Sequence, residues 1–256
     1  MKLTDHVNHI RSLIYKAYNN RFARLGLGEK NEQDISLIPE ELHSLRVQLD
    51  EMLENHIGET GNYKAAREKA LDELSFTLFN RIAAIKVMEA RQLFPEIITK
   101  RTDHGDRSFA HKAWLELNPN GRELELEGLE FFLEHEFDKL SEKMQLFEKD
   151  HPYALMPFTI DLNDIIDAFN AVEQDKDAGA DTWQSDDILG WLYESYNSLK
   201  KKEHKDSGKK TEFDKVSLQS QVYTPRWVVK FLVDNSLGKL YLEMFPNSQI
   251  KEKYAI

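Results

Sequence analysis

The spacing of apolar residues in segment 63–94 constrains the fold of this chain more than any other feature. Large apolar side chains recur there at intervals of three and four, which places them on one face of a helix. They are Leu71, Leu74, Leu78, Ile82, Ile85 and Met88. Such a face has to be covered by other elements, and Phe94-Pro95 ends the pattern because proline cannot continue a helix. The segment therefore predicts a long helix at the centre of a core.

The same intervals recur along most of the chain, which predicts a mainly α fold. Only 11 Gly and 7 Pro punctuate the 256 residues, so breaks between helices are few. A polar run and the turn signal Asn118-Pro-Asn-Gly121 instead predict a surface loop over 103–121. Further helices are expected over 4–25, 39–56, 122–149, 161–174 and 184–200.

Composition limits the classes of function. The formal net charge is −11, which argues against a wholly basic, histone-like surface but permits a local basic stripe. There is no cysteine, so disulfides, thiolate zinc sites and thiol nucleophiles are excluded. The first residues are too polar for a signal peptide, and no apolar run approaches the roughly 18 residues of a membrane span. We expect a soluble, cytoplasmic protein that does not interact with membranes.

Two groupings of polar residues were weighed as sites of metal or nuclease chemistry. His104, Asp106 and His111 fall within one short segment, but no helix is expected to align them, so we interpret them as a polar surface loop. A nuclease would need acidic residues and a Glu-x-Lys lysine together on strands, whereas Glu203-His-Lys205 lies in a lysine-rich run. We therefore predict no metal site and no nuclease.

Near the carboxyl end, Thr224-Pro225 predicts the start of a helix that runs to about Tyr241. Threonine is a good N-cap, and proline at the first helical position loses no needed donor. Free N–H groups at this start suit a carboxylate or phosphate, and Tyr223 offers a ring or a hydroxyl, although a purely structural helix gives the same pattern. Apolar residues cover more than half the circumference, so burial on several sides is expected for Val228, Val229, Phe231, Leu232, Val233, Leu237 and Leu240.

Three segments have amino-acid sequences that are more informative than the spacing of their apolar residues. They read FTLFNRIAAIKVMEARQLFPEI over Phe76–Ile97, DILGWLYESYN over Asp187–Asn197 and VYTPRWVVKFLVDNSLGKLY over Val222–Tyr241. In the same order, they resemble the amino-terminal region of DNA adenine-N6 methyltransferases. The likeness is greatest to the PglX-type enzymes of BREX phage-defence systems and to related type II restriction-modification methylases.

The resemblance implies an enzyme that uses S-adenosylmethionine to methylate adenine N6 in double-stranded DNA after extruding the base. It places Tyr223, Thr224 and Pro225 at the cofactor pocket, with Trp227 as pocket wall or packing residue. The glycine-rich loop and the Asn-Pro-Pro-Tyr/Phe signature of these enzymes do not occur in this sequence. We therefore expect the chain to stop before the Rossmann-like sheet, to hold no catalytic residue, and to be inactive alone, with weak or absent cofactor binding.

A lysine-rich run precedes the third segment, and residues 200–215 are expected to form an exposed, mobile loop. Its lysines are candidates for contacts with DNA phosphates, which need only mobile cations near the backbone. The alternative is a solvated linker. The DNA-binding candidates are Lys200, Lys201, Lys202, Lys205, Lys209 and Lys210.

These patterns predict a helical amino-terminal domain over 1–199, a lysine-rich linker over 200–220 and the start of a methyltransferase domain over 221–256. We interpret the chain as the amino-terminal portion of the enzyme, acting as a scaffold and as a candidate contact for DNA or other defence-system proteins. The alternative is a non-enzymatic helical interaction or regulatory module. Arg81 is expected to pair with an acidic residue of a neighbouring helix, and Trp183 and Trp191 to serve in core or interdomain packing.

Overall fold

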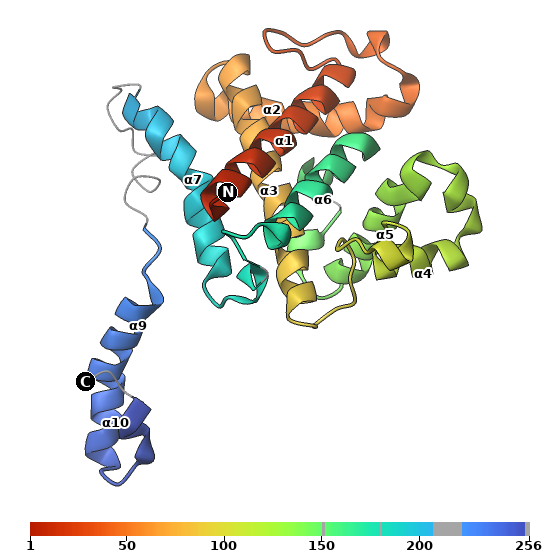
Figure 1. Cartoon of the computed structure of the whole chain (residues 1–256). Coiled ribbons are helices and arrows are strands. Elements are labelled where there is room, and N and C mark those ends of the chain that lie inside the picture. The colour runs from red at the N-terminus through yellow and green to blue at the C-terminus, as the bar shows by residue number, and fades with distance from the viewer. Residues whose placement is uncertain (150–151, 180, 207–221, 254–256) are drawn as a thin grey trace. The chain divides into compact units, whose positions relative to one another are not determined.

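The fold is mainly α, as the sequence predicted. The computed structural model describes residues 1–149, 152–179, 181–206 and 222–253 (Figure 1). Within these ranges there are helices, short 3-10 turns and two isolated β-bridges, but no strand. The chain divides into two compact units, Met1–Gln184 and Ser185–Ile256. The domain boundaries expected from the sequence, and the Rossmann-like sheet beyond them, stay predictions.

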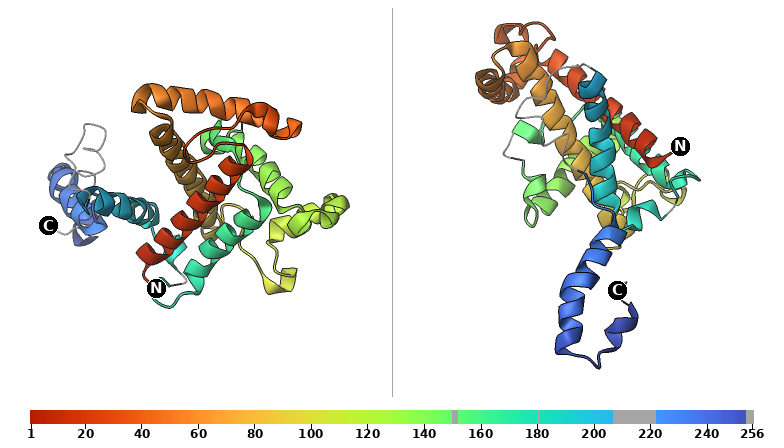
Figure 2. Two further views of the ribbon diagram at one scale, coloured as in Figure 1. Left: turned by 90° about the horizontal axis from the view of Figure 1, so that it is seen from above. Right: turned by 90° about the vertical axis from the view of Figure 1, so that its left-hand side faces the viewer.

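The first unit is a helical domain built around α3. Helix α1 packs against both α3 and α6, α2 packs along α3, and α5 packs against α6 and α4 (Figure 2). The rings of Phe79 and Phe169 lie 5.4 Å apart in the core that this arrangement encloses. The helices are α1 (Leu3–Arg24), α2 (His43–Thr60), α3 (Tyr63–Ala90), α4 (Phe109–Leu117), α5 (Leu129–Ser141) and α6 (Thr159–Gln174).

Helix α3 confirms the expectation of a long central helix. Its N-terminus is capped by Asn62, whose Oδ1 accepts from the backbone N–H of Ala65 at 2.9 Å. The predicted apolar face is buried, except that Met88 is half-buried. The helix ends at Ala90 rather than Phe94, because Gln92 adopts a left-handed conformation with φ of 57°.

Arg81 holds the segment that follows α5 against α3. It is only 4% exposed, and its guanidinium donates to three backbone carbonyls. The distances are 2.6 Å from Nε to Leu146 O, 2.9 Å from Nη2 to Glu148 O and 3.2 Å from Nη1 to Tyr153 O. The expected pairing with an acidic side chain was therefore wrong: this arginine supplies donors to carbonyls that the irregular segment cannot satisfy itself.

Two further buried arginines do the same for the loop after α1. Arg46 Nη1 donates to Leu25 O at 2.9 Å, and Arg67 Nε donates to Leu27 O at 3.0 Å. Both side chains are at least nine-tenths buried. Arginine side chains thus fix irregular loops to the helical core by donating hydrogen bonds to their backbone carbonyls.

The helix expected over 122–149 and the loop expected over 103–121 were both wrong in part. Leu126 and Glu127 have φ of 45° and 55°, which a right-handed helix cannot contain, so α5 starts only at Leu129 and ends at Ser141. Helix α4 occupies the supposed loop, with Ser108 as its cap: Oγ accepts from His111 N at 3.1 Å. This helix was missed because it has only 9 residues and follows a polar stretch that is typical of a loop.

The second unit contains α7 (Ile188–Asp206), α9 (Arg226–Val233), the π-helical turn η9 (Asp234–Gly238), α10 (Lys239–Met244) and the 3-10 turn η10 (Gln249–Lys253). We refer to residues 226–244 as the C-terminal rod. Two side chains within the π turn bond back to carbonyls of α9: Asn235 Nδ2 donates to Phe231 O at 2.9 Å, and Ser236 Oγ donates to Leu232 O at 2.7 Å.

Two expectations about the second unit need correction. Pro225 precedes the helix in extended conformation, with ψ of 143°, and its N-cap position makes no side-chain cap bond, so the rod begins at Arg226 without the expected threonine cap. Residues 200–206 form the last turns of α7 instead of a loop. None of the described helices has the length and apolar character needed to cross a lipid bilayer.

Candidate cofactor site and DNA-binding surface

Tyr223, the first predicted cofactor residue, lies against helix α7. A Cβ built on Gly190 would fall 1.9 Å from Tyr223 Cε2, so the ring rests directly on the glycine backbone. The Tyr223 hydroxyl donates to Asp187 Oδ1 at 2.7 Å, and this hydrogen bond is the main reason that the pKa of Tyr223 is raised. The structure therefore brings together two of the three segments that carry the resemblance.

The next residues start the C-terminal rod. Arg226 forms an ion pair with Asp186, adjacent to the partner of Tyr223. The backbone N–H groups of Val228 and Val229 both donate to Pro225 O, at 2.9 and 3.2 Å. The N–H groups of Arg226 and Trp227 precede these bonds and, as at any helix start, are not used within the helix. An anionic group placed there would meet two backbone donors and the positive end of the helix dipole.

The C-terminal rod exposes its apolar face, contrary to the expectation of burial on several sides. Trp227 is 73% exposed and Leu237 is 67% exposed. Val229, Phe231, Leu232, Val233 and Leu240 are also exposed, whereas Val228 is half-buried. Large exposed apolar patches are typical of surfaces that bind another protein element, a membrane or a ligand.

The predicted DNA-binding lysines fall into two groups. Lys200, Lys201, Lys202 and Lys205 lie in the last turns of α7, where Lys202 and Lys205 are exposed; Lys209 and Lys210 lie outside the described residues. Positive charge near a helix C-terminus is also favoured by the helix dipole, so their position serves a structural role as well. Whether they contact DNA stays a prediction.

Charge is distributed unequally between the two units. Residues 1–184 carry 22 Lys and Arg against 35 Asp and Glu, whereas residues 185–256 carry 12 against 10. The net charge of the first unit is therefore −13 and that of the second +2. Basic residues are therefore in slight excess in the second unit, whereas acidic residues are in large excess in the first.

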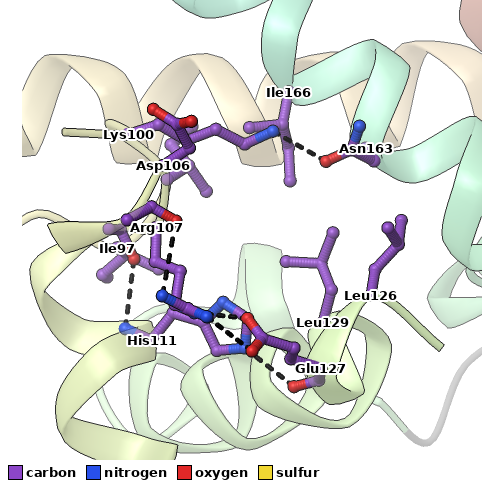
Figure 3. Close-up of a pocket in the computed structure, with 13 residues that line it drawn as sticks. Ile97, Lys100, Asp106, Arg107, His111, Leu126, Glu127, Leu129, Asn163 and Ile166 are labelled. Atoms are coloured by element: carbon purple, nitrogen blue, oxygen red, sulfur yellow. Dashed lines mark hydrogen bonds and ion pairs between the residues drawn. The ribbon is translucent and has the colours of Figure 1, made fainter. Parts of the chain in front are cut away.

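The helical domain contains a cavity of about 310 Å³ that the sequence did not reveal (Figure 3). Figure 3 shows Leu126 and Leu129 on one side of the cavity and Ile97 beside Arg107 on the opposite side. Three of the four non-glycine residues with positive φ in the described chain line it: Asp106, Leu126 and Glu127. A positive φ in residues other than glycine is not predicted by any sequence pattern.

The charges at this cavity are largely paired with one another. Arg107 donates from Nε and Nη2 to the two carboxylate oxygens of Glu127, which lowers the pKa of Glu127. Lys100 Nζ donates to Asn163 Oδ1 at 2.7 Å and pairs with Asp167 at 2.6 Å. These contacts fix the cavity walls and leave little uncompensated charge for a ligand to meet.

His111 points inward rather than to the surface, so its assignment to a surface loop was wrong. Its ring stacks on Phe132 with centroids 4.7 Å apart, and Nε2 lies 3.0 Å from Glu127 O. Burial lowers the pKa of His111, which favours a neutral ring that donates from Nε2 to the carbonyl. Among the described residues, no group of three or more His, Cys, Asp or Glu is arranged to hold a metal ion.

Comparison with known proteins finds two adenine-specific methyltransferases. The chain is 28% identical over 219 residues to BrxX of Escherichia coli O9:H4 (strain HS), covering 74% of this chain and 17% of BrxX. It is 27% identical over 204 residues to PglX of Lacticaseibacillus casei (strain Zhang), covering 68% of this chain and 16% of PglX. The chain thus spans about a sixth of the length of these relatives. No family model and no solved structure matches it.

Proposed function

Since this chain is related to the PglX-type adenine-specific methyltransferases, we propose that it is the amino-terminal portion of an S-adenosylmethionine-dependent DNA adenine-N6 methyltransferase of a BREX or restriction-modification defence system. In this proposal the helical domain is a scaffold, and the C-terminal rod is the first element of the catalytic domain. The relatives are about six times longer than the matched region, which leaves ample chain for a catalytic sheet.

The observation that carries the proposal is the exposed apolar face of the C-terminal rod. Burying one large aliphatic or aromatic side chain contributes about 1.5–3 kcal/mol. Six of the seven apolar residues on which the sequence prediction rested are exposed, so roughly 10 kcal/mol of burial is available to a covering element. A sheet of the methyltransferase domain, supplied by a longer polypeptide, is the covering element that the relatives suggest.

The start of the rod fits the methionine end of S-adenosylmethionine. The free N–H groups of Arg226 and Trp227 suit its carboxylate, and the exposed Trp227 ring offers an apolar wall. Tyr223, Thr224 and Pro225 place this helix start beside α7. When bound, the cofactor supplies the methyl group, while the residues of this chain bind and orient it. No residue of this chain is assigned to the chemical step.

A methylation assay tests the proposal. With tritiated S-adenosylmethionine and adenine-containing duplex DNA, the 256-residue chain should transfer no label, whereas a polypeptide extended through a glycine-rich loop and an Asn-Pro-Pro-Tyr/Phe segment should transfer it. Transfer by the 256-residue chain would contradict the division of function proposed here. Absence of transfer by the extended polypeptide, with every DNA of the host tested, would contradict the enzymatic assignment.

A second candidate function, a helical interaction module, is favoured by the charge of the first unit. With a net charge of −13, residues 1–184 repel DNA phosphates and attract a basic protein surface. In a gel-shift titration at low salt, removal of residues 185–256 should abolish any DNA binding. Retained binding by the first unit would count against an interaction module and for a DNA-contacting scaffold.

A further inference from the structure

The contact between Tyr223 and helix α7 has a feature that packing alone does not require. Gly190 lies in the first turn of α7 and has no side chain to pack against the ring. Three atoms of the Tyr223 ring, Cε2, Cδ2 and Cζ, would lie 1.9, 2.2 and 2.4 Å from a Cβ at this position. Any side chain at residue 190 therefore displaces the tyrosine ring.

A second contact fixes the rotation and the polarity of the same side chain. The Tyr223 hydroxyl donates its proton to Oδ1 of Asp187, the residue that immediately precedes α7. With that proton committed, the phenol oxygen has only lone pairs left for another partner. Tyr223 can thus accept a hydrogen bond from a ligand but does not donate one. A ligand group at this oxygen has to be a donor, such as an ammonium.

The neighbouring ion pair ties the start of the rod to the turn that precedes α7. Arg226 pairs with Asp186, so consecutive carboxylates of this turn hold two residues that flank Thr224-Pro225. Asp187 and Arg226 are also the charged groups that act on the ionisation of Tyr223, the first raising its pKa and the second lowering it. Ring position, hydroxyl polarity and helix start are therefore all set by the first turn of α7 and the two residues before it.

We propose that Asp187 and Gly190 are positioning residues of the cofactor site: Gly190 provides the space for the Tyr223 ring, and Asp187 takes its hydroxyl proton, so that Tyr223 presents its oxygen as an acceptor to the ammonium group of the cofactor. This inference rests on the proposed function for the identity of the ligand. The positioning itself is a property of the 256-residue chain. Neither residue touches the reacting methyl group in this proposal.

Fluorine NMR on the chain labelled with 3-fluorotyrosine tests the positioning without any cofactor. Tyr223→Phe identifies the resonance of Tyr223 by its loss. We expect Gly190→Ala to shift this resonance and Asp187→Asn to lower its titration midpoint, because the acceptor that raises the pKa is weakened. Gly58→Ala is the matched control, since Gly58 is also helical but has no atom within 4 Å of its Cβ position. An unmoved resonance in Gly190→Ala and an unmoved midpoint in Asp187→Asn would overturn the inference.

Calorimetry with S-adenosylmethionine on the longer, cofactor-binding polypeptide tests the link to function. Gly190→Ala should raise Kd at least tenfold, and the effect should disappear when Tyr223 is already alanine, because the two changes act through one side chain. Additive effects would refute positioning through Tyr223. Cofactor binding that is absent from the unmodified polypeptide would refute the proposed function, while the fluorine result would still decide whether α7 positions Tyr223.

Discussion

Replacing Arg81 by methionine should destabilise the helical domain strongly. Methionine keeps most of the side-chain volume but removes the donors to the carbonyls of Leu146, Glu148 and Tyr153. Removing the hydrogen-bond partner of a buried polar group costs about 1–3 kcal/mol of stability. The cost for each of these carbonyls lies in the lower half of this range, because water can reach some of them when the segment moves away. Taking the lower half of that range for each of the three bonds gives about 3–6 kcal/mol. This is a large share of the stability of an ordinary domain, which is about 5–15 kcal/mol.

The assay is urea unfolding followed by circular dichroism at 222 nm, with Arg24→Met as the matched control. Arg24 is exposed in the last turn of α1, so its replacement should cost less than about 1 kcal/mol. Arg81→Lys should fall between the two variants, because an ammonium can reach one or two of the carbonyls but not all three in the plane of the guanidinium. A loss below about 1 kcal/mol for Arg81→Met would show that these carbonyls do not depend on the arginine.

Three further predictions concern pH, backbone conformation and salt. Burial raises the pKa of Glu89 in the folded state. The contribution of Glu89 to stability is therefore fully present below its unfolded pKa of about 4.3 and is lost as pH rises through its folded pKa. Urea unfolding from pH 4 to 8 should show a fall in the free energy of unfolding, and Glu89→Gln should flatten this fall. Leu126→Gly should change the free energy of unfolding by less than about 1 kcal/mol, because relief of its positive φ offsets the loss of an exposed side chain. Leu129→Ala should instead cost about 2–5 kcal/mol. If the same unfolding assay gave as large a loss for Leu126→Gly as for Leu129→Ala, the strain argument would be refuted. If the α7 lysines contact phosphates, the double replacement of Lys202 and Lys205 by alanine should reduce the slope of log K against log salt by up to about 2, and an unchanged slope would favour the linker interpretation.

Regular helices were predictable because their signal is repeated along the sequence. Helices α1, α3 and α6 lie close to their predicted ranges, since several apolar residues recur at helical spacing in each. The region from 103 to 149 was not predictable in the same way. Its conformation depends on Leu126 and Glu127 at positive φ, and Glu127 is held there by Arg107 across a tertiary contact. Such a contact has no counterpart in local periodicity.

The resemblance names residues for a candidate cofactor site but not the residues that contact them. The resemblance pointed to Tyr223, Thr224 and Pro225, whereas nothing in the spacing of the chain linked Tyr223 to Asp187 or Gly190. The bond joins residues 36 positions apart, across a segment that lies outside the described residues. Gly190, in the first turn of α7 and next to Trp191, was the one local sign of a close approach.

Hydrogen exchange of the C-terminal rod, compared between the 256-residue chain and a polypeptide extended through a glycine-rich loop and an Asn-Pro-Pro-Tyr/Phe segment, bears most directly on the proposed role of this region. We predict that amides of residues 226–244 exchange much more slowly in the longer protein, and more slowly again when S-adenosylmethionine is added. Equal exchange in both proteins, unaffected by the cofactor, would mean that no catalytic sheet covers the rod and that it does not belong to a cofactor site.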